Sequence, residues 1–370
     1  MVGVPARCLC SALRLQPLNR ERTTLLRKNN RFINFTIIAT ILVLVGPSYA
    51  HHSDAGLDME SVVAFEGTVN KFVWRNPHVY VLVEEQNENG DAVVWDVQMG
   101  PVNVISRRGW RKDTLQPGDR VTVRAHAAIN GRPYGVIASI DKEGGLGLVP
   151  TSGAPQEPAM TTTLEGNWIA DRSATMSYPG GFDGFFNALL TPNEKGLAAK
   201  AAYDPLSSEN PEATCVGRPT PAALVSTSLY LMQIDIQEEQ DIVILHSEWY
   251  DEKRTVYMDG REHPDPSERL VTGYSIGHWD GDTLVVDTRN FDDHRSPYQT
   301  GVPSGGQKRV VERYRLSDDG RSIELEFMLE DPEYLAEPMV HRRPLMYSPH
   351  MEMFSGKCDL ESTSRFIRNK

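Results

Sequence analysis

Several signatures of common enzyme and metal-site classes are missing from this 370-residue chain. It has no Gly-x-Ser-x-Gly nucleophile elbow, no phosphate-binding glycine loop and no dinucleotide fingerprint. Its 4 cysteines form no Cys-x-x-Cys pair and no Cys/His zinc spacing. These absences exclude the familiar serine-hydrolase, nucleotide-binding and zinc-finger patterns, so any chemistry must come from other side chains.

Basic residues are also scarce relative to acidic ones. The chain has 38 Lys and Arg against 50 Asp and Glu, a net charge of -12. Residues 1–50 hold seven of the basic residues and one Glu, which leaves 38 − 7 = 31 basic and 50 − 1 = 49 acidic residues beyond them, a net charge of -18. A strongly acidic body without a basic patch argues against nucleic acid and anionic lipid as partners.

The first 50 residues have the pattern of a secretory signal. A basic stretch at 27–31 precedes an apolar run at 32–45, Gly46-Pro47 ends that run, and small residues at Ser48 and Ala50 supply a cleavage motif. The run is too short for a comfortable membrane span. We predict cleavage after Ala50 and a periplasmic or secreted protein without membrane attachment; an uncleaved anchor is the alternative.

Cys215 and Cys358 are the two cysteines that remain after such cleavage. In an oxidising compartment two such cysteines often pair. We predict a disulfide that ties an irregular, proline-rich loop at 203–220 to the final strand. Two separate thiols are the alternative.

The region 51–143 carries the signals of a small β domain. Apolar alternation and Asn-Gly turns predict three strands, a short helix at 101–110, then two strands. This is the element order of a five-stranded OB-like barrel. The predicted strands cover 62–73, 79–85, 93–99, 120–128 and 133–141.

The predicted mature N-terminus begins with two histidines. The free amine and imidazole of His51 can chelate copper together, and His52 or His78 can complete the site. We therefore predict a possible copper site at His51, His52 and His78. A frayed polar terminus is the plain alternative.

A resemblance covers 51–145. The sequence there is similar to a family of exported bacterial proteins known only as a domain of unknown function. The resemblance implies an exported small β domain and brings no activity. It rests on His51-His52-Ser53, Asn76-Pro77-His78, the run RRGWRKD at 107–113 and Pro117-Gly118-Asp119.

The segment 144–163 is rich in Gly, Pro, Ser and Thr and reads as a linker. The region 164–370 then opens with Gly166-x-Trp168, which resembles the start of lipocalin-type barrels, and its C-terminal part resembles other uncharacterised exported proteins. Successive strand-like runs predict a larger lipocalin-like antiparallel barrel, and a helix is expected at 192–202. The predicted strands cover 229–236, 241–250, 254–258, 275–279, 283–288, 308–316, 322–329 and 339–346.

The stretch 257–288 concentrates candidate site chemistry. Two Asp-Gly pairs predict two hairpin turns, and their spacing of 21 residues, Asp259 to Asp280, predicts tips at the same end of the barrel. We predict that Asp287 faces a cavity and that the polar residues around both turns converge at the barrel mouth. Solvated surface acids are the alternative. The candidate catalytic residues are Tyr257, Asp259, Arg261, His263, His278 and Asp287.

Three other polar positions receive plainer interpretations. His246 lies in an apolar run and is predicted to be a satisfied strand histidine. His294 is placed on a solvated loop, with closure over a barrel mouth as the alternative. Glu312 and Arg313 are interpreted as a surface ion pair.

These patterns favour a protein that binds a small organic molecule in the second barrel and converts it by acid–base chemistry. His263 or His278 would be the base, Asp259 or Asp287 would orient it, and Arg261 and Tyr257 would contact the substrate. The rival hypotheses are copper binding at the N-terminus and a structural or assembly partner without a small ligand. The sequence does not specify the ligand or the oligomeric state.

Overall fold

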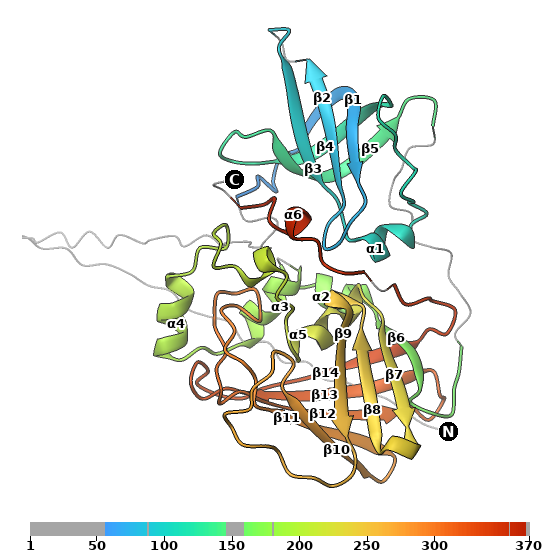
Figure 1. Ribbon diagram of the computed structural model, residues 1–370, viewed down its shortest axis with the longest axis vertical. Coiled ribbons are helices and arrows are strands. Elements are labelled where there is room, and N and C mark those ends of the chain that lie inside the picture. The colour runs from blue at the N-terminus through green and yellow to red at the C-terminus, as the bar shows by residue number, and fades with distance from the viewer. Residues whose placement is uncertain (1–55, 87–88, 146–158, 180, 355, 368–370) are drawn as a thin grey trace, which may run out of the picture. The chain divides into compact units, whose positions relative to one another are not determined.

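A computed structural model describes residues 56–86, 89–145, 159–179, 181–354 and 356–367. The predicted signal, His51, His52 and most of the predicted linker lie outside the described residues. The protein is mainly β and contains one closed barrel of five strands and one of nine (Figure 1). Both predicted barrels are therefore confirmed as architecture. Among the described residues, no helix is both long and apolar enough to cross a bilayer.

The first barrel has the strand order β1-β2-β3-β5-β4, with β3 and β5 parallel and the other neighbours antiparallel. A short helix, α1, lies between β3 and β4, as predicted. This connectivity is that of an OB-like barrel. The elements are β1 (Val63–Val73), β2 (Tyr80–Gln86), β3 (Ala92–Gln98), α1 (Val102–Ser106), β4 (Arg120–Ala127) and β5 (Tyr134–Lys142).

Period-two alternation builds the core of this barrel. Val81 and Val83 on β2 and Val121 and Val123 on β4 point inward and are buried. Gly67 is required where β1 curves against β2, because a Cβ there would lie 2.5 Å from the backbone oxygen of Glu84. The interior is thus filled by aliphatic side chains together with the aromatic rings of Phe65 and Trp110.

The second barrel has the order β10-β11-β12-β13-β14-β6-β7-β8-β9, closed by pairing of β9 with β10. Eight of its strands match predicted runs to within a few residues, and the ninth, β6, was not predicted as a strand. They are β6 (Gly166–Ala170), β7 (Met232–Gln237), β8 (Ile242–Ser247), β9 (Glu252–Tyr257), β10 (Tyr274–Asp280), β11 (Thr283–Arg289), β12 (Arg309–Leu316), β13 (Ser322–Glu330) and β14 (Met339–Tyr347).

One junction departs from the predicted antiparallel barrel. β9 and β10 pair in parallel, with Val256 opposite Ser275 and Tyr257 opposite Ile276. Parallel neighbours cannot be joined by a tight turn. The chain between them, 258–273, must therefore return along the barrel before β10 begins.

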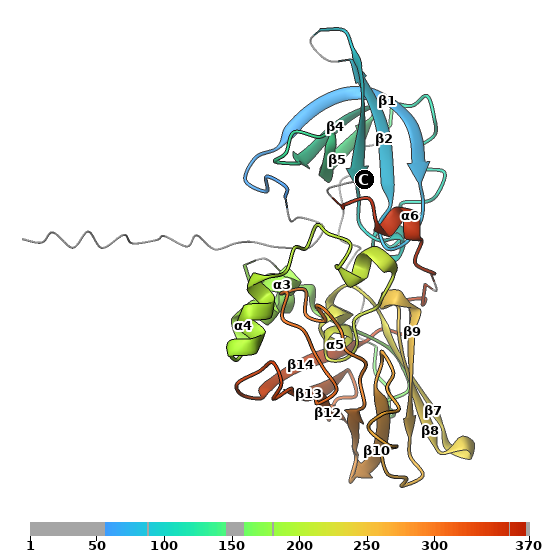
Figure 2. The ribbon, with the colours of Figure 1, turned by 60° about the vertical axis from the view of Figure 1, so that its left-hand side comes forward.

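Helices cover one end of the second barrel. Phe185 and Phe186 on α3 and Leu224 and Val225 on α5 join the buried core formed by the inward faces of the strands (Figures 1 and 2). Trp168 is fully buried in the same core, and its indole nitrogen donates to the carbonyl oxygen of Leu164 at 2.8 Å. Sequence reasoning found only α4 among the helices of this region. The helices are α2 (Arg172–Met176), α3 (Gly181–Leu189), α4 (Glu194–Ala201), α5 (Ala222–Val225) and α6 (Leu360–Thr363), with short 3-10 helices at Pro211–Thr214, Ser226–Ser228, Glu238–Gln240 and Trp249–Asp251.

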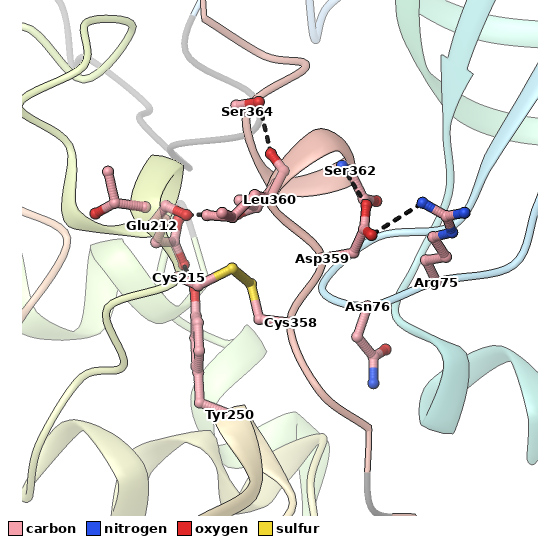
Figure 3. The surroundings of a disulfide bond; sticks show 12 residues. Arg75, Asn76, Glu212, Cys215, Tyr250, Cys358, Asp359, Leu360, Ser362 and Ser364 are labelled. Carbon is pink, nitrogen blue, oxygen red and sulfur yellow. Dashed lines mark hydrogen bonds and ion pairs between the residues drawn. A yellow bond between two sulfur atoms is a disulfide. The ribbon is translucent and has the colours of Figure 1, made fainter.

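Cys215 and Cys358 form the predicted disulfide, with Cα atoms 5.8 Å apart (Figure 3). The prediction that Cys358 belongs to the final strand is wrong, because this residue lies in the segment between β14 and α6. Asp359, its neighbour, caps α6 by accepting from the Ser362 amide at 2.9 Å, and it pairs with Arg75 at 2.9 Å. The crosslink closes a loop of 143 residues.

Candidate functional site

The two Asp-Gly turns have different structural roles. Asp280-Gly281 connects β10 to β11 in the predicted hairpin. Asp259-Gly260 does not form a hairpin, because β9 continues into the crossover to its parallel neighbour. Each turn comes directly after the C-terminal end of its strand, β9 or β10. Because these two strands are parallel, both turns lie at the same end of the barrel, as the spacing predicted.

Asp287 faces outward, which corrects the prediction that it faces a cavity. Leu284, Val286 and Thr288 are the inward, fully buried positions of β11. Alternation in a strand then directs Asp287 to the outer wall. The valine that shares its face, Val285, is covered although it lies outside the barrel.

Five of the six predicted residues gather on this outer wall. The rings of Tyr257 and Tyr274 stack with centroids 5.1 Å apart, and the Arg261 guanidinium lies 3.9 Å from the Tyr257 ring centroid. The Arg261 Nε donates to Asp259 at 2.8 Å, and this hydrogen bond holds the pKa of Asp259 below its ordinary value. We call the five residues the outer-wall cluster: Tyr257, Asp259, Arg261, His263 and Asp287.

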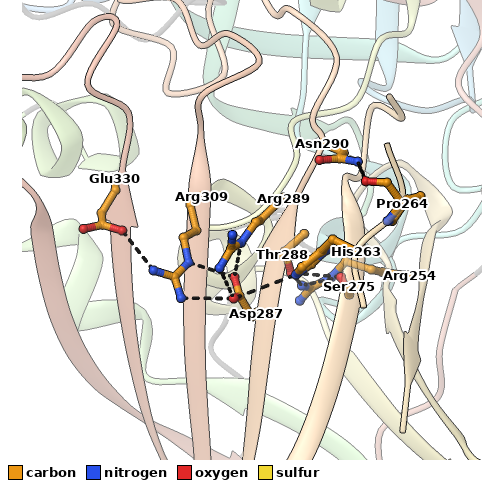
Figure 4. A network of polar contacts seen from close by, with 10 residues as sticks. All are labelled: Arg254, His263, Pro264, Ser275, Asp287, Thr288, Arg289, Asn290, Arg309 and Glu330. Atoms are coloured by element: carbon orange, nitrogen blue, oxygen red, sulfur yellow. Dashed lines mark hydrogen bonds and ion pairs between the residues drawn. The ribbon is translucent and has the colours of Figure 1, made fainter. Parts of the chain in front are cut away.

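His263 and Asp287 meet within this cluster, at 3.8 Å between Nε2 and Oδ2 (Figure 4). Two arginines hold the carboxylate: Arg309 donates to it at 2.9 Å and Arg289 at 2.8 Å. Burial opposes ionisation of Asp287, yet these arginines keep its pKa below the ordinary value. Burial lowers the pKa of His263, with Asp287 opposing that shift.

His278, the sixth predicted residue, does not join them. It is exposed near the C-terminal end of β10, where its ring helps to lower the pKa of Asp280. The contacts of the outer-wall cluster instead fasten the 258–273 crossover onto the sheet: Arg261 and His263 come from the crossover, and Tyr257, Tyr274 and Asp287 from strands. The catalytic assignment of these residues stays a prediction.

The predicted copper ligands cannot be assembled from the described residues. His51 and His52 lie outside them, and His78 is partly buried with its backbone oxygen accepting from the Ser362 hydroxyl at 2.7 Å. Within the described parts of the chain, no group of three or more His, Cys, Asp or Glu side chains is arranged to hold a metal ion. The copper site stays a prediction.

A second polar arrangement, which sequence reasoning did not find, lies inside the barrel beneath the helices. Arg254 on β9 is 5% exposed and Glu312 on β12 is 0% exposed, and they pair at 2.6 Å. Arg254 also donates to Thr288 at 2.8 Å (Figure 4), and Tyr314 donates to Glu312 at 2.5 Å. The interpretation of Glu312 and Arg313 as a surface pair is wrong, because alternation sends these neighbours to opposite faces of β12.

Lys308 is the most unusual residue of this interior. It is 1% exposed, and among the described residues its Nζ has no hydrogen-bond partner. The Nζ lies 4.2 Å from the ring centroid of Phe291 and 5.5 Å from that of Tyr298. Burial lowers the pKa of Lys308 to about 7, against the opposing charges of Asp331 and Glu252.

Two carboxyl groups near Lys308 have raised pKa values, whereas the pKa of Lys308 is lowered. Burial raises the pKa of Glu252 to about 7, although Arg254 and Lys308 oppose the change. Burial also raises the pKa of Asp331 to about 6; its Oδ2 accepts from the Gly305 amide at 3.2 Å, and among the described residues its Oδ1 has no hydrogen-bond partner. Asp331 is buried, whereas Glu252 is partly exposed.

Strand register explains why these groups share one location. Glu252 and Arg254 on β9 and Glu312 on β12 occupy inward positions. Lys308 and Asp331 continue the inward faces of β12 and β13 just beyond the ends of these strands. Antiparallel pairing of β12 with β13 sets Lys308 beside Asp331, because their neighbours Arg309 and Glu330 are paired. We call this set the inner charged site: Glu252, Arg254, Lys308, Glu312 and Asp331.

His294 closes the inner charged site from the β11–β12 loop. It is 5% exposed, so its placement on a solvated loop was wrong and the alternative, closure over the barrel end, fits the structure. The Gly217 carbonyl lies 3.1 Å from Nε2, and Nδ1 accepts from the Ser296 amide at 3.2 Å. Burial, aided by the charge of Lys308, lowers the pKa of His294 to about 3, so the ring is neutral.

His246 on β8 is a strand histidine with a hydrogen-bond partner, as predicted: its Nε2 lies 2.7 Å from Asp251 Oδ1.

Comparison with known proteins finds one family model that matches part of the chain, and no activity comes with it. Residues 40–138 match the model of DUF6152, a family of unknown function. The match covers most of the first barrel and none of the second. A search of curated proteins found no match. This match agrees with the resemblance noted for residues 51–145. Because the family has no known function, the function has to be inferred from the two groups of polar side chains described above.

Proposed function

We propose that the second barrel binds a small organic molecule at its inner charged site and exchanges protons with it. The observation that carries this proposal is Lys308, a buried amine whose Nζ has no hydrogen-bond partner among the described residues. A buried polar group normally has a partner, because leaving it without one costs on the order of 1–3 kcal/mol. A bound ligand would supply the missing partner.

The protonation states of the site support acid–base work. Glu252 and Lys308 have pKa values of about 7, and Asp331 has one of about 6. A group transfers protons best when its pKa lies near the working pH. Clusters of such shifted groups are typical of active sites.

The proposed location of the protein is the periplasm or the extracellular space. The N-terminal pattern of a basic stretch, an apolar run and a small-residue cleavage motif supports export. The Cys215–Cys358 disulfide supports it independently, since such bonds persist mainly in oxidising compartments. Mass spectrometry of the exported protein should find His51 at the N-terminus, and retention of the apolar run would contradict cleavage.

Ligand-dependent thermal stabilisation tests the binding proposal. The wild-type protein would be titrated at pH 7 with benzaldehyde, cyclohexanone, benzoate and pyruvate, one at a time. At 100 times its Kd a ligand stabilises the folded state by about 2.7 kcal/mol, which gives a measurable rise in Tm. At least one compound should produce a saturable rise.

Matched variants locate the binding. Lys308→Met and Glu252→Gln should abolish the rise in Tm, while Lys253→Met should keep it, because Lys253 is the exposed neighbour on the outer face of β9. Circular dichroism would verify that each variant is folded. An equal rise in all variants, or none in the wild type, would overturn the proposal.

A further inference from the structure

Lys308 combines three properties of an amine that attacks carbonyl groups. It is enclosed, it lies against aromatic rings, and within the described chain no hydrogen-bond acceptor holds its Nζ. We propose that Lys308 is a nucleophile that forms a Schiff base with an uncharged aldehyde or ketone. This inference rests on the proposed function, because it requires that a small molecule enter the inner charged site.

The surroundings suit both the free amine and the product. Burial disfavours the ammonium form, so a neutral, nucleophilic amine is present near neutral pH. The product iminium carries a positive charge at the same position. The ring faces of Phe291 and Tyr298 and the carboxylates of Asp331 and Glu252 then stabilise that charge.

Glu252 can carry the protons that the reaction moves. The lone pair of the Lys308 nitrogen forms a bond to the carbonyl carbon, and one nitrogen proton passes through the carboxyl group to the oxygen. The resulting carbinolamine takes a second proton from the Glu252 carboxylic acid. The C–O bond then breaks, water leaves, and the nitrogen lone pair forms the protonated C=N bond. The step consumes one amine, one carbonyl and one proton and releases one water.

The polar groups of the site favour an uncharged substrate over a keto acid. Both terminal nitrogens of Arg254 are engaged, by Glu312 at 2.6 Å and by Thr288 at 2.8 Å, so Arg254 offers little to a substrate carboxylate. The remaining groups near Lys308 are acidic or aromatic. The Tyr298 hydroxyl has no hydrogen-bond partner within the described chain and is a candidate contact for a carbonyl oxygen.

Reductive trapping tests this inference on the wild-type protein. The protein would be incubated at pH 7 with benzaldehyde and cyanoborohydride, which delivers hydride to an iminium carbon, and then digested and mapped by mass spectrometry. Surface lysines with pKa values of about 10.4 react slowly at this pH, whereas the terminal amine, with a pKa of about 7.7–8.0, is an expected competitor. Pyruvate serves as the charged comparison.

The expected result is a fast adduct on the peptide that contains Lys308, heavier by the mass of the probe less one oxygen atom. Its rate should exceed that of Lys253 at least tenfold, and pyruvate should label Lys308 more slowly than benzaldehyde. Saturable stabilisation by benzaldehyde without an adduct on Lys308 would overturn the Schiff base and leave the binding proposal standing. Absence of both stabilisation and adduct, with every compound tried, would overturn both.

Discussion

The outer-wall cluster and the inner charged site use the same kinds of side chain in opposite settings. On the outer wall, Asp287 is held by two arginines and its pKa falls. Inside the barrel, Lys308 has no ion-pair partner within the described residues, and the pKa values of Lys308 and Glu252 converge near 7. Composition alone therefore does not identify a site. Solvent access and the completeness of pairing decide which acids and bases can exchange protons at neutral pH.

The largest expected contrast between the two regions is in stability. Arg254→Met leaves the buried carboxylate of Glu312 without a cation, so we expect a loss of about 3–5 kcal/mol in the free energy of unfolding. Arg309→Met leaves Arg289 on Asp287 and should cost about 1 kcal/mol or less. Urea denaturation of both variants at pH 7 provides the comparison. Similar losses at the two positions would remove the distinction between the regions.

The second contrast concerns alkaline pH. The pKa of Lys308 is about 7 in the folded protein and 10.5 ordinarily, so between these values the unfolded chain binds a proton that the folded chain lacks. Wild-type stability, relative to Lys308→Met, should therefore rise with pH over this window, by at most about 1.4 kcal/mol per pH unit. Denaturation at several pH values measures this slope. A wild-type stability profile that runs parallel to that of Lys308→Met across this window would contradict the lowered pKa.

The third contrast concerns acid. His294 has a pKa of about 3 in the folded protein, against 6.5 ordinarily, so the unfolded chain binds the extra proton between these values. Its contribution to stability is present above pH 6.5 and is lost as the pH falls toward 3. His294→Gln should flatten the acid side of the stability profile by up to about 1.4 kcal/mol per pH unit. An acid side as steep in His294→Gln as in the wild type would contradict the assignment.

The smallest expected effect is at the predicted catalytic pair on the outer wall. His263→Ala and Asp287→Ala should each destabilise the fold by about 1 kcal/mol or less, because both side chains lie in a partly exposed network. With the inner charged site as the binding site, both variants should retain ligand-induced stabilisation. If a folded variant lost that stabilisation, the ligand would bind at the outer-wall cluster, which contains the residues that the sequence pattern selected.

The fold was accessible from the sequence where local signals agreed. Asn130-Gly131 and Asp280-Gly281 each sit between alternating runs, and both join antiparallel partners in the structure. Asp259-Gly260 carries the same local signal yet leads into a crossover, because the parallel pairing of β9 with β10 is a long-range property. A two-residue pattern cannot distinguish these outcomes. The helices over the barrel end are short, 4 to 9 residues, so each offers few turns in which a helical period can be recognised.

The site was only partly accessible. The sequence brought His263 and Asp287 together correctly but placed them at a barrel mouth, whereas β11 directs Asp287 outward. It missed the inner charged site because its members come from three strands, β9, β12 and β13, or from the residues next to them, and each looks like an ordinary surface residue among its sequence neighbours. Glu312 between Val311 and Arg313 is one example. The strand alternation could have identified Glu312 as buried, because Glu312 lies on the same face of β12 as Val310 and Tyr314, which are both buried.

The most direct test of the inner charged site is the pKa of the Lys308 amine. Carbon-13 NMR of the protein labelled at lysine Cε would follow every amine between pH 5 and pH 11, with Lys308→Met assigning the signal. We predict one lysine signal that titrates near pH 7 and disappears in Lys308→Met. Titration of Lys308 together with the surface lysines would contradict the account.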